Sequence, residues 1–142
     1  TTEIYTLSLH DALPILRTGE LQYTNAGHLP PVLLNAAGQA AWVELPKGPV
    51  LGVSEAPTYT TKTLQLKPQD TLLLYTDGVN EAMNTGQELF GDDRLFAFAG
   101  TQTRTAPKEL VDGLFGAVQQ FAGGEEQSDD ITVLALRYSG KS

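Results

Sequence analysis

The feature that most constrains this chain is an apolar run from Thr71 to Thr76 that stops abruptly at Asp77-Gly78. A short run of this kind, bounded by turn residues, is typical of a buried strand. A carboxylate at the end of a buried strand is costly unless it is paired, hydrogen-bonded or bound to a metal. The sequence therefore has to provide a partner for Asp77.

A second pair of acids, Asp129-Asp130, comes directly before another apolar run, Ile131 to Leu134. If the two strands are antiparallel neighbours, the acids converge at one end of the sheet, where a divalent cation would relieve their repulsion. Oxygen ligands without Cys indicate Mg²⁺ or Mn²⁺. The same residues are equally consistent with structure alone, because Asp-Gly is a common turn pair and residues 128–130 can cap a loop.

The order of the predicted elements indicates the fold class. Strand patterns come first, helical patterns follow, and an apolar strand closes the chain, which favours an α+β fold with a mostly antiparallel sheet. We expect strands around Leu21–Tyr23, Val32–Leu34, Ala41–Leu45, Tyr59–Leu66, Thr71–Thr76 and Ile131–Tyr138, a helical turn at Glu81–Asn84, and a short helix at Gly91–Phe98.

The clearest helix is predicted to start near Thr105 as N-cap, with Pro107 in its first turn, and to stop at Gly123-Gly124. Its apolar residues recur at helical spacing. The aromatic side chains, including Trp42 and Phe96, are expected in the core.

Composition narrows the function classes. The 142 residues suit one domain or a large piece of one, and the net charge of −8 opposes nonspecific binding to nucleic acid or anionic lipid. The absence of Cys excludes disulfides, zinc-thiolate sites and cysteine nucleophiles. No apolar run approaches the roughly 20 residues of a membrane span, so we expect no membrane segment. Since there is no Cys and the N-terminus lacks the basic region of a secretory signal, we expect a cytoplasmic location.

Four segments occur in order along the chain: Leu21–Pro31, Gly48–Val53, Leu74–Ala82 and Ser128–Thr132. Together they resemble the SpoIIE/RsbU-type branch of the metal-dependent (type 2C, PPM) serine/threonine phosphatases. The segments Leu66–Thr71 and Phe90–Leu95 also look like that branch, with Gln69 where a Gly is usual, and the resemblance extends from Arg17 to about Tyr138.

The resemblance implies a sandwich of two antiparallel β-sheets flanked by helices, with a binuclear Mg²⁺ or Mn²⁺ centre at one end. Asp77 and Asp129 match direct metal ligands, and Asp130 is a neighbouring candidate. Gly78 would leave room near the metal. His28 lies in a turn near the site, where a structural role is favoured over ligation. No protein side chain serves as nucleophile, because metal-bound water would attack the phosphate ester.

The implied function is protein serine/threonine dephosphorylation. The expected substrate is a phosphorylated regulatory protein such as an anti-sigma-factor antagonist, and the parent protein is expected to carry an upstream sensory or receiver domain. Two other hypotheses stay open. One is a non-catalytic protein-binding or regulatory module of the same fold, and the other is a single structural cation held by Asp77 and Asp129.

The start of the chain departs from the family pattern. The family carries a further Asp-Gly motif, whose carboxylate bridges the two metals, in its first third, and nothing before Asp77 matches it. We therefore expect residues 17–142 to be the C-terminal part of an N-terminally truncated phosphatase domain. Residues 1–16 match the pattern poorly, and we interpret them as an artefactual segment fused to a genuine frame.

Overall fold

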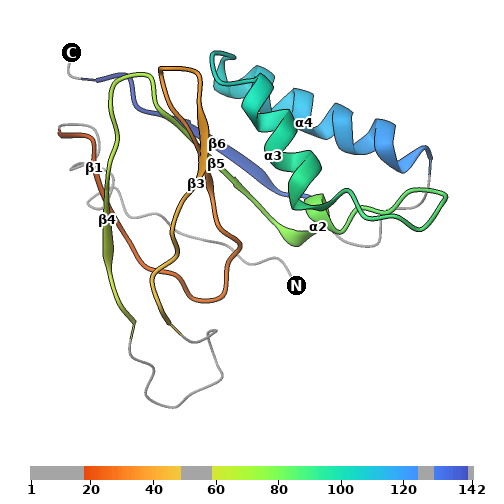
Figure 1. The fold of residues 1–142 in the computed structure, drawn as a ribbon, viewed down its shortest axis with the longest axis horizontal. Coiled ribbons are helices and arrows are strands. Elements are labelled where there is room, and N and C mark those ends of the chain that lie inside the picture. Colours follow the sequence, from red (N-terminus) through yellow and green to blue (C-terminus); the bar gives the residue numbers. More distant parts are fainter. Residues whose placement is uncertain (1–17, 49–58, 125–129, 141–142) are drawn as a thin grey trace.

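The strands of the computed structural model form two antiparallel sheets (Figure 1). The structure describes residues 18–48, 59–124 and 130–140. One sheet pairs β1 (Glu20–Tyr23) with β4 (Lys62–Gln65). The other has the order β3-β2-β5-β6, and its members are β2 (Val32–Leu34), β3 (Ala40–Trp42), β5 (Thr71–Tyr75) and β6 (Val133–Arg137).

Within the described residues, three helices lie between β5 and β6 along the chain. They are α2 (Asp77–Asn80), α3 (Gly91–Thr101) and α4 (Pro107–Ala122). In Figure 1 the four-stranded sheet lies between the β1-β4 pair and the layer formed by α3 and α4. The predicted α+β class, with two antiparallel sheets flanked by helices, is confirmed.

The four-stranded sheet separates two apolar cores because its side chains alternate between its faces. The larger core lies toward the helices, where Val32 and Leu73 pack with Leu95, Leu110 and other apolar residues of α3 and α4. The smaller core lies toward the β1-β4 pair and consists of Val43, Leu66, Leu72 and Tyr138, with Leu21, Leu33, Leu64 and Leu136 partly buried against it. Strand β5 contributes to both cores, which explains its continuous apolar sequence.

The smaller core does not extend along the whole face of the sheet. Leu74 of β5 and Leu134 of β6 are directly opposite each other in the ladder. They are 38% and 46% exposed. This exposed pair lies at the end of β5 that leads to Asp77.

The predicted apolar periodicity and C-terminal end of the long helix are both confirmed in α4. Its buried residues Leu110, Leu114 and Val118 recur at intervals of about one turn, and Gly123 ends it in the left-handed conformation at φ 65°. The predicted Thr105 cap is wrong. Ala106 is the N-cap, and the Thr105 hydroxyl instead donates to Oε1 of Gln102 at 2.8 Å.

The prediction that Trp42 belongs to the core is also wrong. Trp42 is 39% exposed on the outer strand β3. Its ring stacks on Phe96 of α3, with the ring centroids 5.1 Å apart. An aromatic residue on an outer strand can thus contact the helical layer on one side while its other side stays in water.

Candidate functional site

Two acid-bearing segments meet at one end of the four-stranded sheet. Strands β5 and β6 are antiparallel neighbours, and Tyr75 at the end of β5 pairs with Val133 at the start of β6. One residue farther on, the Thr76 N–H donates to the Thr132 carbonyl at 3.0 Å. The predicted meeting of the two strand ends is therefore confirmed for the backbone next to Asp77 and Asp130, and the convergence of their carboxylates stays a prediction. Asp129 lies outside the described residues.

The Asp77 side chain is exposed, although it follows a buried strand. Asp77 is the first residue of α2, and its backbone carbonyl accepts a hydrogen bond from the Glu81 N–H at 2.8 Å. Among the described residues, none donates a hydrogen bond to its carboxylate and none forms an ion pair with it. The strand end reaches solvent, so the carboxylate keeps its hydration and needs no protein partner.

Gly78 does not turn the chain by an unusual backbone conformation. It is buried within α2 and is not among the described residues with positive φ. The chain turns because the strand passes directly into a helical turn that starts at Asp77. The predicted helical turn at Glu81–Asn84 is therefore displaced toward the N-terminus, to Asp77–Asn80.

His28 lies in a turn that leads into the same end of the sheet. Its backbone N–H donates to Oδ1 of Asn25 at 2.9 Å, and Gly27 has φ 107°. Strand β2 begins four residues later, and its first residue, Val32, pairs with Leu73 of β5. Since β2 runs antiparallel to β5, the turn lies toward the Asp77 end.

A polar group at α2, which sequence reasoning missed, links this helical turn to α3 and includes two buried oxygen atoms. Asn80 donates through Nδ2 to Oδ1 of Asp92 at 3.0 Å, which ties α2 to the first turn of α3. The Tyr75 hydroxyl and Asn80 Oδ1 are buried, and neither has a hydrogen-bond partner among the described residues. Burial, with a smaller contribution from the negative charge of Asp92, raises the pKa of Tyr75 far above its usual value. Tyr75 therefore stays neutral at physiological pH.

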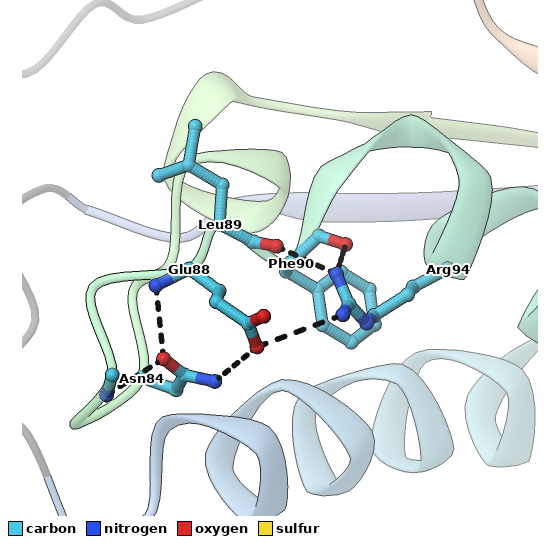
Figure 2. A network of polar contacts seen from close by, with 6 residues as sticks. Asn84, Glu88, Leu89, Phe90 and Arg94 are labelled. Atoms are coloured by element: carbon cyan, nitrogen blue, oxygen red, sulfur yellow. Dashed lines mark hydrogen bonds and ion pairs between the residues drawn. The ribbon is translucent and has the colours of Figure 1, made fainter.

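A hairpin closed by a bridge and side-chain hydrogen bonds follows α2. Met83 and Leu89 form an antiparallel bridge, and Asn84 Oδ1 accepts hydrogen bonds from the Gly86 and Glu88 amides at 2.9 Å each. Figure 2 shows Asn84 and Arg94 on opposite sides of Glu88. Arg94 also donates to the Leu89 and Phe90 carbonyls, at 2.8 and 3.2 Å.

The hairpin is also anchored to the helical layer. The Arg94 guanidinium lies 4.7 Å from the centroid of the Phe121 ring in α4. The Phe90 and Phe121 rings meet edge to face at 5.5 Å. The segment after Asp77 is thus fixed to α3 and α4 by both polar and aromatic contacts.

The described residues at this end offer oxygen ligands of the kind that a hard cation binds, but they offer few of them. Carboxylate oxygens are the ligands that Mg²⁺ and Mn²⁺ prefer, and the hydrated carboxylate of Asp77 is available for such a contact. Within residues 18–48, 59–124 and 130–140, however, no group of three or more His, Cys, Asp or Glu could hold a metal ion. Asp77 and Asp130 alone therefore do not form such a group.

The helices of the described segments include none that is both long and apolar enough to cross a membrane.

Comparisons with known proteins agree with this architecture. The model of the family described as Stage II sporulation protein E (SpoIIE) matches residues 6–139. Protein IcfG of Synechocystis sp. is 34% identical over 121 residues, which cover 85% of this chain and 19% of IcfG.

Two solved structures are similar in fold. The SiaA-PP2C domain of Pseudomonas aeruginosa matches with a TM-score of 0.66 at 20% identity, over 84% of this chain and 46% of that one. The RsbU and RsbW domains of Rv1364c from Mycobacterium tuberculosis match with a TM-score of 0.62 at 30% identity, over 86% and 33% of the two chains. The chain thus spans less than half the length of each of these proteins.

Proposed function

Because the chain belongs to the SpoIIE family and has the fold of PP2C phosphatase domains, we propose that it acts in a metal-dependent protein serine/threonine phosphatase. The observation that carries the proposal is the meeting of two acid-bearing segments at one end of the central sheet. Asp77 follows β5 and Asp130 precedes β6, and the Tyr75–Val133 pair brings the two strands together.

Asp77 and Asp129 would hold the cations, with Asp130 as a neighbouring ligand. Mn²⁺ or Mg²⁺, two ions in the complete centre, would activate water and bind phosphoryl oxygens when present. The chain itself contributes rigidity, because Asp77 continues from a strand buried in two cores and its helical turn is tied to α3 through Asn80 and Asp92. Gly78 and His28 would lie near the site without direct chemistry.

The substrate would be a phosphorylated regulatory protein such as an anti-sigma-factor antagonist, and the setting would be cytoplasmic signalling. In Rv1364c, RsbU and RsbW domains occur in one protein. A domain of this kind thus occurs beside a further domain, and we propose an upstream sensory or receiver domain in the parent protein. The net charge of −8 favours a protein partner over nucleic acid.

Hydrolysis of p-nitrophenyl phosphate with and without Mn²⁺ tests the proposal, with Asp77→Asn as the key variant. Asp93→Asn is the matched control, because Asp93 is also an exposed acid in the first turn of a helix. The test uses the chain extended upstream to include the Asp-Gly motif that supplies the bridging carboxylate. In this extended form we expect Mn²⁺-dependent turnover without substitution and with Asp93→Asn, and none with Asp77→Asn. Equal turnover in all three proteins would remove Asp77 from the site.

A second candidate is a non-catalytic regulatory module of the same fold. The observation in its favour is that no group of three acids suited to a metal occurs in the described segments. Under this alternative the folded chain would bind no Mn²⁺ in calorimetry and would not hydrolyse the phosphate ester. Binding without hydrolysis would instead indicate a structural cation.

A further inference from the structure

Thr76 stands where the chain leaves a strand and enters a helix. It is the N-cap of α2, yet its side chain makes no capping hydrogen bond to the helix. A Thr at this position ordinarily accepts a hydrogen bond from a backbone N–H of the first helical turn. The Thr76 hydroxyl therefore has another role.

The hydroxyl turns back toward the segment that precedes β6. Thr76 Oγ1 accepts a hydrogen bond from the Thr132 N–H at 3.0 Å and donates to the Asp130 carbonyl at 3.1 Å. In the same place the Thr76 N–H donates to the Thr132 carbonyl. Three hydrogen bonds from a single residue thus hold residues 130–132 against the end of β5.

The backbone explains why a hydroxyl is needed. In a regular antiparallel ladder, two residues that face each other in a hydrogen-bonded pair exchange both N–H···O=C bonds. At Thr76 the carbonyl accepts instead from the Val79 N–H at 3.0 Å, because the chain is already turning into α2. The side-chain oxygen takes the place of that carbonyl, and the ladder continues for one more residue.

We propose that Thr76 is a positioning residue, whose hydroxyl holds the Asp130 segment against the strand end that carries Asp77. This inference rests on the proposed metal centre, because Thr76 would keep the two acid-bearing segments at the distance that the centre needs. Removal of an outer partner that orients metal ligands typically weakens metal affinity about 10- to 100-fold. A similar loss is expected here.

The test compares Thr76→Val, which keeps the shape without the hydroxyl, with Thr76→Ser, which keeps the hydroxyl. Thr71→Val is the matched control, because the Thr71 hydroxyl accepts from Arg137 Nε at 2.8 Å and joins the same two strands at their other end. Mn²⁺ affinity by calorimetry, amide exchange of Thr132 and thermal unfolding are measured for each protein.

We expect Thr76→Val to bind Mn²⁺ about 10-fold or more weakly and to exchange the Thr132 amide faster. Thr76→Ser should restore both properties. Thr71→Val should lower the unfolding temperature while leaving Mn²⁺ affinity and Thr132 exchange as in the parent chain.

Two results would overturn the inference in distinguishable ways. If the parent chain binds Mn²⁺ and Thr76→Val binds it equally well, Thr76 has a structural role only, and the proposed function stands. If the parent chain binds no Mn²⁺, the proposed metal centre fails together with the role of Thr76 in it.

Discussion

An aspartate lies at each end of β5, and the two aspartates have opposite environments. At its start, Asp70 is 3% exposed, and its carboxylate accepts hydrogen bonds from the Ala36 and Lys67 amides at 3.1 and 2.9 Å. At its end, Asp77 is exposed, and none of the described residues donates to its carboxylate. The number of hydrogen bonds that the protein donates to each carboxylate distinguishes the two roles. Asp70 stabilises the fold, whereas Asp77 is available to a ligand.

The two ends of β5 also differ in how far their apolar side chains are buried. At the Asp70 end, Leu66, Leu72 and Tyr138 are buried together in the smaller core. At the Asp77 end, the facing pair Leu74 and Leu134 stays exposed. The Asp70 end of β5 is thus covered by other parts of the chain, and we call it the closed end. The Asp77 end stays exposed to solvent, and we call it the open end.

Substitution of Asp70 should have the largest effect of the changes considered. Asp70→Ala leaves two backbone amides without their acceptor, so we expect a loss of about 3 kcal/mol in the free energy of unfolding. Asp70→Asn keeps one acceptor oxygen and should lose about half as much. Urea unfolding measures both, with Asp77→Asn, expected within about 0.5 kcal/mol of the parent chain, as the contrast. Equal losses at Asp70 and Asp77 would contradict the division between the two ends.

Mn²⁺ should act on the open end alone. A ligand at about 100 times its Kd stabilises the folded state by about 2.7 kcal/mol, so saturating Mn²⁺ should raise the unfolding temperature of the parent chain. The increase should disappear in Asp77→Asn and persist in Asp70→Asn, although the latter starts from a lower temperature. Thermal unfolding with and without Mn²⁺, repeated with EDTA, provides the measurement. A shift that survives in Asp77→Asn would place the cation elsewhere.

The smallest effect is expected at Gln69, in the closed end. Gln69 has φ 74° and follows Pro68 in a turn closed by a hydrogen bond from the Asp70 N–H to the Lys67 carbonyl at 2.9 Å. A left-handed conformation costs a residue with a side chain about 1–2 kcal/mol, and Gly avoids this cost. Gly also loses more chain entropy on folding, which cancels part of the gain. Gln69→Gly should therefore stabilise the chain by about 0.5 kcal/mol in urea unfolding. Destabilisation would show that the Gln69 side chain contributes more than the strained backbone costs.

Local sequence signals predicted much of the fold. The helix at Pro107–Ala122 follows from its apolar period, from Pro107 and from Gly123, and β5 follows from its continuous apolar run. The position of Gln69 where the family usually has Gly has a direct structural counterpart in its positive φ. Each of these signals lies within a few residues of the feature that it predicts.

The long-range bonds that define the two ends could not be predicted in this way. Asp70 meets an amide 34 residues away, and the Thr76 hydroxyl meets a carbonyl 54 residues away. The predicted meeting of the end of β5 with the start of β6 is confirmed, because strand pairing fixes which ends meet. Exposure of Asp77 did not follow from its sequence, since it depends on where the surface of the folded sheet lies.

The insertion of the whole helical layer between β5 and β6 has a consequence for the time course of folding. The hairpin of β2 and β3 closes through a turn of a few residues, whereas the contact of Thr76 with Asp130 closes a loop of 54 residues. Closing so long a flexible loop costs about 3.5 kcal/mol of chain entropy, which prior formation of α3 and α4 would reduce. The acid-bearing end should therefore assemble late, after the helices have shortened the path between its two halves.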